Sequence, residues 1–269
     1  MTIVVANTKG GVGKTIISHH ILPALFVEDD VEINVFEIDD NNRSVINDNS
    51  KKVNYKSIKI NEMEDDVDKV KMDDLFNGDK FVNIIDCGGG NDTIAILNHL
   101  AKSNMDNITY IIPVNSDIEQ VDNVIQTADL INSYSENAKI ILIFNRAKDL
   151  NNYKEQFAGF FGSNIYDVTG RMEEVKDKID DFFVLKETIL YNIIKNVYKT
   201  TFAEELPNYQ YTVENSKELE RRWAKQGVEY FKKQMKFFRL AKESLALFDE
   251  IKPLKELLQN QNKGKDNDE

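Results

Sequence analysis

One stretch near the start of the chain constrains its fold more than any other feature: TKGGVGKT at residues 8–15, directly after the apolar run IVVA at 3–6. A strand that turns into a glycine-rich loop and then a helix forms a cradle for an anion, because backbone N–H groups turn inward on a phosphate and the helix N-terminus adds partial positive charge. Such a loop places Lys14 at the β- and γ-phosphates of a nucleotide and the Thr15 hydroxyl on Mg²⁺. The alternative is a glycine-rich turn that binds nothing.

Apolar runs recur along the chain in a β–α rhythm. We expect strands at 3–7, 33–39, 53–60, 81–86, 108–114 and 139–145, with a weaker one near 164–168. We expect helices at 14–27, 62–76, 92–104, 118–135 and 151–161. Several strands are apolar on successive residues, as happens when helices cover both faces of a sheet. The sequence therefore predicts an α/β fold, a doubly wound and mostly parallel sheet, with its ligand at the carboxyl ends of the strands.

From about residue 177 glycine becomes scarce and apolar residues follow helical spacing. One helix is expected through Val184, Ile189, Ile193, Ile194, Val197 and Phe202. A longer one is expected through Trp223, Val228, Phe231, Met235, Phe238, Leu245 and Phe248, ended by Pro253, with Pro207 in the connection between the two. We expect a single domain over 1–260, with a core at about 1–170, a helical C-terminal portion at about 177–258 and a disordered polar tail at 260–269.

The composition bounds the class of protein. The chain has 269 residues, of which 41% are hydrophobic, and no apolar run approaches the eighteen or so residues of a membrane helix. The first strand begins at Ile3, so we expect neither a signal peptide nor an N-terminal DNA-binding domain. We expect a cytoplasmic protein. The single cysteine, Cys87, excludes a disulfide framework and is expected to be a small buried residue. The net charge of −12 means that any contact with DNA must come from a local basic patch.

The phosphate loop departs from the ordinary pattern, which has a glycine where Thr8 stands, and a second lysine, Lys9, opens the loop. This deviant form, KGGxGKT, resembles the ParA/MinD family of P-loop ATPases, and most of all plasmid-type ParA partition proteins. The resemblance implies an ATP-sandwich homodimer in which Lys9 crosses to the phosphates of the partner. The nitrogenase iron protein shares the loop but needs two cysteines per subunit, so that function is excluded.

Two strand ends carry further candidates. The run FEIDDNN at 36–42 stands where the family has D-x-D-P-Q, with Glu37 for the first Asp and Asp39 for the second. By this resemblance Asp39 positions the attacking water and faces the Mg²⁺ shell, and Asp40 takes the place of the proline. The run DCGGG at 86–90 supplies Asp86 to hold an Mg²⁺-bound water, and glycines that let a backbone N–H swing toward a γ-phosphate. The alternatives are a solvated turn at Asp39 and a turn-capping aspartate at Asp86.

A third strand end is the sequence Ile-Phe-Asn-Arg, in which Asn145 matches an asparagine that reads the adenine edge in the MinD-like branch. A turn-forming asparagine is the alternative. The catalytic candidates are Lys9, Lys14 and Asp39. The metal-binding candidates are Thr15, Asp39 and Asp86. The candidates for binding ATP are Lys9, Gly10, Gly11, Val12, Gly13, Lys14, Thr15, Ile16, Gly89 and Asn145.

The late helix is locally basic, although the whole chain is acidic. In ParA-like proteins a basic surface of the ATP-bound dimer holds non-specific DNA through phosphate contacts. The candidates for this role are Lys225, Lys232, Lys233, Lys236 and Arg239, of which 225, 232, 236 and 239 are expected on one helical face; the alternative is a solvated helix face. The acidic end KGKDNDE has no apolar face, which disfavours the membrane-binding helix of MinD-like proteins.

The resemblance as a whole implies a partition ATPase that uses ATP and Mg²⁺, dimerises on ATP and binds DNA non-specifically. It would associate with the nucleoid and segregate a plasmid or other DNA cargo, with hydrolysis stimulated by a ParB-like centromere-binding partner. One alternative is a positioning ATPase for a protein cargo. Another is a non-hydrolysing, nucleotide-dependent scaffold or filament protein, and the presence of both Asp39 and Asp86 argues against it.

Overall fold

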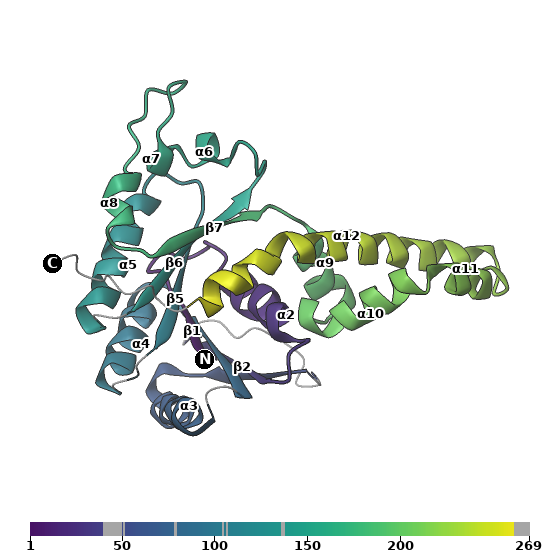
Figure 1. Cartoon of the computed structure of the whole chain (residues 1–269), viewed down its shortest axis with the longest axis horizontal. Helices are drawn as coiled ribbons and strands as arrows, with labels where there is room; N and C mark the ends of the chain where they lie inside the picture. Colours follow the sequence, from purple (N-terminus) through teal and green to yellow (C-terminus); the bar gives the residue numbers. More distant parts are fainter. Residues whose placement is uncertain are drawn as a thin grey trace.

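The computed structural model describes residues 1–39, 50, 52–77, 80–103, 105, 107–135 and 138–260 (Figure 1). Two sequence predictions therefore lie outside the described residues: the position of Asp40 and the disordered tail, of which only Asn260 is described. No helix within these ranges is long and apolar enough to cross a membrane.

Seven parallel strands form one sheet in the order β3-β2-β4-β1-β5-β6-β7. The strands are β1 (Thr2–Val5), β2 (Glu32–Ile38), β3 (Val53–Ile58), β4 (Phe81–Cys87), β5 (Ile108–Val114), β6 (Lys139–Ala147) and β7 (Asp181–Lys186). The first six match the predicted strands to within two residues at each end. Strands β1, β4, β5 and β6 are almost completely buried, which explains their nearly continuous apolar sequences.

Helices cover both faces of the sheet, so the predicted doubly wound fold is confirmed (Figure 1). One face carries α3 (Glu64–Asn77), α4 (Asn91–Lys102), α5 (Gln120–Tyr134) and α8 (Met172–Lys176), with the short η2 (Ile60–Glu62), α6 (Tyr153–Gln156) and α7 (Ala158–Phe161) beside them. The other face carries the helix that follows the phosphate loop, in three segments: α1 (Lys14–Ile16), the π-helical η1 (Ile17–Ile21) and α2 (Leu22–Phe26). Cys87 is buried, as predicted.

The C-terminal portion differs from the prediction in its first half. The expected helix through Val184 and Phe202 is wrong, because that stretch contains β7, α9 (Leu190–Ile193) and the π-helical η4 (Ile194–Tyr198). The predicted strand near 164–168 is also wrong: only an isolated antiparallel bridge joins Ser163 and Val168. Strand β7 lies at the edge of the sheet beside β6 and is only half-buried, although the residues from Phe182 to Leu185 are apolar in succession.

The second half is helical, as predicted, but the two prolines do not interrupt it. Pro207 lies inside α10 (Phe202–Glu214) and Pro253 inside α12 (Val228–Gln259), with α11 (Ser216–Ala224) between them. A proline removes one backbone donor from a helix. The burial of Ile251, Leu254 and Leu258 around Pro253 compensates for that loss, since packing supplies most helical stability in proteins.

Residues 202–239 form a helical arm that projects away from the sheet (Figure 1). Along the arm α10 packs against α12, with the rings of Tyr209 and Phe237 5.7 Å apart. Gly227, with a φ of 100°, makes the turn from α11 into α12, so the predicted continuous helix through Trp223 and Val228 is wrong: Trp223 lies on α11. Lys225 precedes this turn, so the prediction that it shares one helical face with Lys232 is wrong. At its root the arm rests on the helix that follows the phosphate loop, with α10 against η1 and α2.

Candidate functional site

The phosphate loop connects β1 to α1 and needs glycine at two positions. Gly11 and Gly13 adopt φ values of 77° and 100°, in the left-handed region that side chains with a Cβ rarely occupy. At Gly13 there is also no room, because a Cβ would lie 2.1 Å from Asn145 Nδ2. The loop therefore has the glycine-dependent shape that the sequence predicts for a phosphate cradle.

Two polar residues that the sequence reasoning missed fix the start of this loop. Asn7 is fully buried; its Nδ2 donates to the carbonyl of Pro113 at 2.7 Å, and its Oδ1 accepts from the backbone N–H of Lys9 at 2.8 Å. Thr93, on α4, donates from Oγ1 to the carbonyl of Asn7 at 3.2 Å. A buried asparagine that ends an apolar strand was the available signal, since buried amides need partners.

Lys14 lies inside the loop. Its Nζ donates to the carbonyls of Asn7 at 3.1 Å and of Lys9 at 3.2 Å. An ammonium group has three donors, so one remains for a phosphate oxygen. Burial lowers the pKa of Lys14, while the carboxylates of Asp86 and Asp39 act to raise it. Lys14 is thus held where an anion in the cradle would meet it.

Asp86 is the next-to-last residue of β4, lies beneath the loop and is 3% exposed. Burial raises its pKa to about 7; the hydroxyls of Ser18 and Thr15 act in the opposite direction, and the charge of Glu37 adds to the rise. Its Oδ1 has no hydrogen-bond partner among the described residues. A carboxylate oxygen in this position, next to the Thr15 hydroxyl, is suited to holding a cation or its bound water.

The other predicted strand-end residues also lie around the cradle. Asp39 follows β2, and its charge reaches Lys14. Gly89 faces the loop, since a Cβ on it would lie 3.7 Å from Gly10 Cα and 3.9 Å from Lys14 Nζ. The backbone N–H of Gly90 donates to the carbonyl of Thr8 at 2.8 Å. The structure therefore brings the ends of β1, β2 and β4 together at one edge of the sheet.

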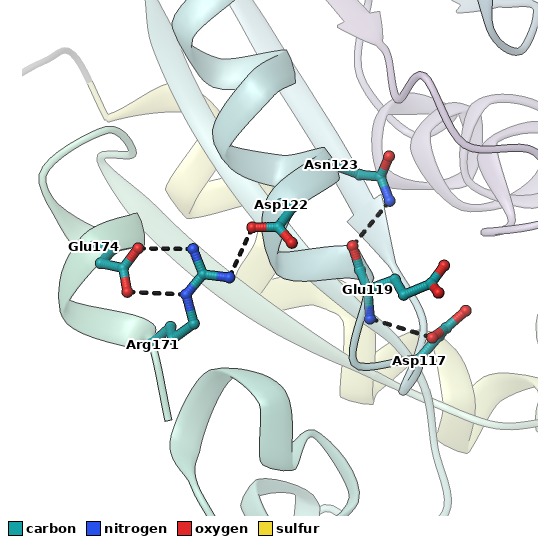
Figure 2. Close-up of polar contacts among 6 residues, drawn as sticks. All are labelled: Asp117, Glu119, Asp122, Asn123, Arg171 and Glu174. Atoms are coloured by element: carbon teal, nitrogen blue, oxygen red, sulfur yellow. Dashed lines mark hydrogen bonds and ion pairs between the residues drawn. The ribbon is translucent and has the colours of Figure 1, made fainter. Parts of the chain in front are cut away.

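Lys9 extends away from the cradle of its own chain. Its Nζ lies 3.5 Å from Glu119 Oε2, and the side chains are 42% and 77% exposed. Figure 2 shows Glu119 just before α5, where its backbone N–H donates to Asp117 Oδ1 at 3.2 Å. In the same view Arg171 bridges Asp122 and Glu174. Exposed ion pairs of this kind stabilise a protein by about 1 kcal/mol at most, so Lys9 is readily released.

Asn145 closes the site from the end of β6. Its Nδ2 donates to the carbonyl of Val12 at 2.8 Å, so the amide braces the phosphate loop in this structure. The same residue lines a cavity of about 220 Å³ together with Ile16, which follows the loop on α1. The rest of the lining comes from the ends of β6 and β7 and from η1, α9 and α12, and includes Arg146, Glu187, Thr188, Tyr191 and Ile251. This cavity adjoins the cradle, where a group attached to the bound phosphates would lie.

The five basic residues predicted to contact DNA lie on the helical arm, away from the cradle. Lys225 ends α11, and Lys232, Lys233, Lys236 and Arg239 lie on α12; all five are exposed. Of these five residues Lys232 forms an ion pair, with Glu229 at 3.1 Å. The structure therefore places a basic surface and a phosphate cradle in different parts of the molecule.

Comparisons with known proteins find similar solved structures at low identity. A variant of McdA from Cyanothece in complex with ATP is 13% identical, with 76% of this chain and 89% of that chain covered and a TM-score of 0.48. The MinD cell division protein from Aquifex aeolicus is 14% identical, with 78% and 89% covered and a TM-score of 0.48. The septum site-determining protein MinD from Pyrococcus horikoshii OT3, complexed with Mg-ADP, is 16% identical, with 71% and 84% covered and a TM-score of 0.45. No protein-family model and no curated protein matches the chain.

McdA and MinD belong to the ParA/MinD family, which the loop sequence resembles. The class of this protein follows from its own geometry: a parallel sheet wound on both sides, with a glycine-shaped loop between β1 and the first helix, is a P-loop nucleotide-binding fold.

Proposed function

We propose that this chain is a positioning ATPase that binds ATP with Mg²⁺ in the phosphate loop and hydrolyses it. The observation that carries the proposal is the placement of Lys14 Nζ inside a loop shaped by Gly11 and Gly13, with the buried carboxylate of Asp86 beneath it. A structural turn has no need of a buried ammonium group, and its burial is costly unless it serves a ligand or a strong partner.

The residues present fit Mg²⁺. The Thr15 hydroxyl and the carboxylates of Asp86 and Asp39 are oxygen donors, which Mg²⁺ prefers, and Asp86 Oδ1 is buried without a hydrogen bond among the described residues. When bound, Mg²⁺ neutralises charge on the β- and γ-phosphates. The cavity lined by Ile16 and Asn145 adjoins the cradle and would receive the base of the nucleotide.

The chain's own groups then divide the reaction between them. Lys14 and the N–H groups of the loop hold the phosphates, and Asp39 orients a water toward the γ-phosphorus. Attack by that water forms a new P–O bond and breaks the bond between the γ-phosphorus and the bridging oxygen, giving ADP and inorganic phosphate. Gly89 and Gly90 allow the loop after β4 to follow the γ-phosphate, since they lie against the cradle.

Two finer proposals concern partners. Lys9, whose Nζ pairs with the exposed Glu119, would reach the nucleotide of a second copy in an ATP-dependent homodimer. The basic arm would hold non-specific DNA through phosphate contacts, so that the protein associates with the nucleoid and segregates a plasmid or other DNA cargo with a ParB-like partner. If the arm does not bind DNA, positioning of a protein cargo is the better interpretation.

Steady-state ATPase and nucleotide-binding assays on single variants test the central proposal. Lys14→Ala should abolish ATP binding, because it removes a ground-state contact to phosphate. Asp39→Ala should keep ATP binding and lower the hydrolysis rate by about 100-fold or more, the usual cost of losing a preorganised group. Asp117→Ala, an exposed aspartate outside the cradle, is the control and should behave like the wild type.

An unchanged ATPase rate in Asp39→Ala would contradict the role of Asp39, and Asp40→Ala would then be tested. ATP binding with no hydrolysis in the wild type, even with candidate partners added, would favour a nucleotide-dependent scaffold instead.

A further inference from the structure

Three buried side chains meet beneath the phosphate loop: His19 from η1, Glu37 from β2 and Asp86 from β4. They are 2%, 7% and 3% exposed, and one ligand atom from each lies within 4.8 Å of those of the other two. Glu37 and Asp86 are direct neighbours in the register of the parallel strands β2 and β4, so the pleat directs both carboxylates to the same face of the sheet. Only His19 comes from a helix.

The two carboxylates of this cluster differ in their partners: Glu37 Oε2 accepts a hydrogen bond from Ser57 Oγ at 2.6 Å. Asp86 Oδ1 is buried and accepts no hydrogen bond within the described ranges of the chain. The nearest ammonium group, that of Lys14, donates to the carbonyls of Asn7 and Lys9. Buried carboxylates in proteins are paired with cations or bind metal ions, because an uncompensated charge away from water is costly. The unpartnered oxygen of Asp86, next to the carboxylate of Glu37, therefore favours a cation at this cluster.

The geometry suits a metal with a nitrogen ligand. His19 Nδ1 lies 3.5 Å from Asp86 Oδ2 and 2.9 Å from Ser18 Oγ, whose hydrogen bond a metal ion would replace. Two ligands that are each about 2.1 Å from an ion in a tetrahedral arrangement lie about 3.4 Å apart, so an ion fits between these atoms with little movement. The ring of His19 is already oriented, because it stacks on Tyr55 at 5.6 Å with an interplanar angle of 6°, and Tyr55 OH donates to the carbonyl of His19 at 3.0 Å.

We propose that His19, Glu37 and Asp86 form a site for a divalent transition-metal ion of the Zn²⁺ class in the nucleotide-free protein. An imidazole with two carboxylates suits such ions, whereas Mg²⁺ takes oxygen ligands. The two negative charges balance the ion, which would also tie the helix of the phosphate loop to β2 and β4. If the proposed function holds, this ion competes for Asp86 with the Mg²⁺ that accompanies ATP.

Metal titration of the nucleotide-free protein tests the proposal independently of ATPase activity. The full chain is stripped with EDTA and titrated with Co²⁺ in excess Mg²⁺, following the visible absorption of Co²⁺, and then with Zn²⁺ in competition. One ion per chain is expected. His19→Gln and Glu37→Gln should each weaken binding by about tenfold or more, since even residues that only orient metal ligands contribute that much. His99→Gln makes the same change on α4 and should bind like the wild type.

Circular dichroism checks that the variants fold. X-ray absorption on the wild-type Co²⁺ complex gives an answer even if they do not, because one imidazole should be bound to the ion. Absence of Co²⁺ binding in the wild type, binding that is unaffected by His19→Gln, or a complex without imidazole would each overturn the proposal. Those results would leave His19 as a neutral side chain that is hydrogen-bonded to Ser18 Oγ.

Discussion

The close approach of Gly13 and Asn145 gives a quantitative prediction for nucleotide-free stability. In Gly13→Ala, a Cβ at 2.1 Å from Asn145 Nδ2 must displace that amide, which then loses its bond to the carbonyl of Val12. The left-handed backbone costs about 1–2 kcal/mol for a residue with a Cβ, and a buried carbonyl left without its donor about 1–3 kcal/mol. Gly13→Ala should therefore lower the free energy of unfolding by about 2–5 kcal/mol.

The double variant separates the two contributions. Asn145→Ala alone should cost about 1–3 kcal/mol, because the Val12 carbonyl loses its donor. In that background Gly13→Ala should cost only the backbone strain of about 1–2 kcal/mol, since the clash is gone. The two substitutions should thus be less than additive by about 1–3 kcal/mol.

Urea unfolding followed by circular dichroism measures these differences at neutral pH without nucleotide. Gly10→Ala is the matched control, because no atom lies within 4 Å of a Cβ built there and its φ is outside the left-handed region, so it should change stability little. Costs for Gly13→Ala and Asn145→Ala that add to within about 0.5 kcal/mol would refute the reasoning.

Three further predictions concern assembly, cargo and pH. With a slowly hydrolysed ATP analogue, the wild type and the control Lys148→Ala should form dimers in light-scattering measurements, whereas Lys9→Ala should remain a monomer. Equal masses for all three proteins would show that Lys9 is an ordinary surface residue of the loop. Charge reversal of Lys233 and Lys236 should weaken ATP-dependent binding to DNA of any sequence and flatten its salt dependence in anisotropy measurements, without changing ATP affinity, whereas reversal of Lys154 should not. Burial, with the charges of His19 and Lys195, lowers the pKa of His20 to about 3 from 6.5. Below pH 6.5 the His20 imidazole therefore binds a proton in the unfolded chain but stays neutral in the native protein. Wild-type stability should therefore fall as the pH drops from 7 to 5, by about 2 kcal/mol from this group, and the urea midpoint of His20→Gln should lack that part of the fall.

The sequence was sufficient for the parts of the fold that depend on local pattern. Six strands were predictable because buried parallel strands are apolar on both faces, and β4 with Ile84-Ile85 is an example. The edge strand β7 was missed, because Val184 also fits the helical spacing of the apolar residues that follow it, and the prediction assigned it to their helix. The prediction that Pro253 ends the long helix was wrong for a different reason. Packing of the C-terminal part of α12 against the core outweighs the backbone donor that Pro253 lacks, and such packing is not visible in a local sequence pattern.

In the candidate site, too, the residues that form a contiguous motif were predictable and those that meet through the fold were not. The loop glycines and Lys14 are contiguous in sequence, so their motif predicted where they lie. Whether Asp39 and Asn145 act as the resemblance implies stays a prediction. The meeting of His19 with Glu37 and Asp86 could not be predicted, because it depends on β2 lying beside β4 in the sheet, and strand order is a property of the whole fold.

The root of the helical arm has a mechanical consequence. The backbone N–H of Phe202, the first residue of α10, donates to His20 Nδ1 at 3.3 Å, on the same helix that begins at Lys14. The longest helix of the arm is α12, which has 32 residues and thus a length of about 48 Å. If α12 rotated by about 5° about its end at the sheet, its far end would move by about 4 Å. A small tilt of the helix that follows the phosphate loop would therefore move the tip of the arm further than its root.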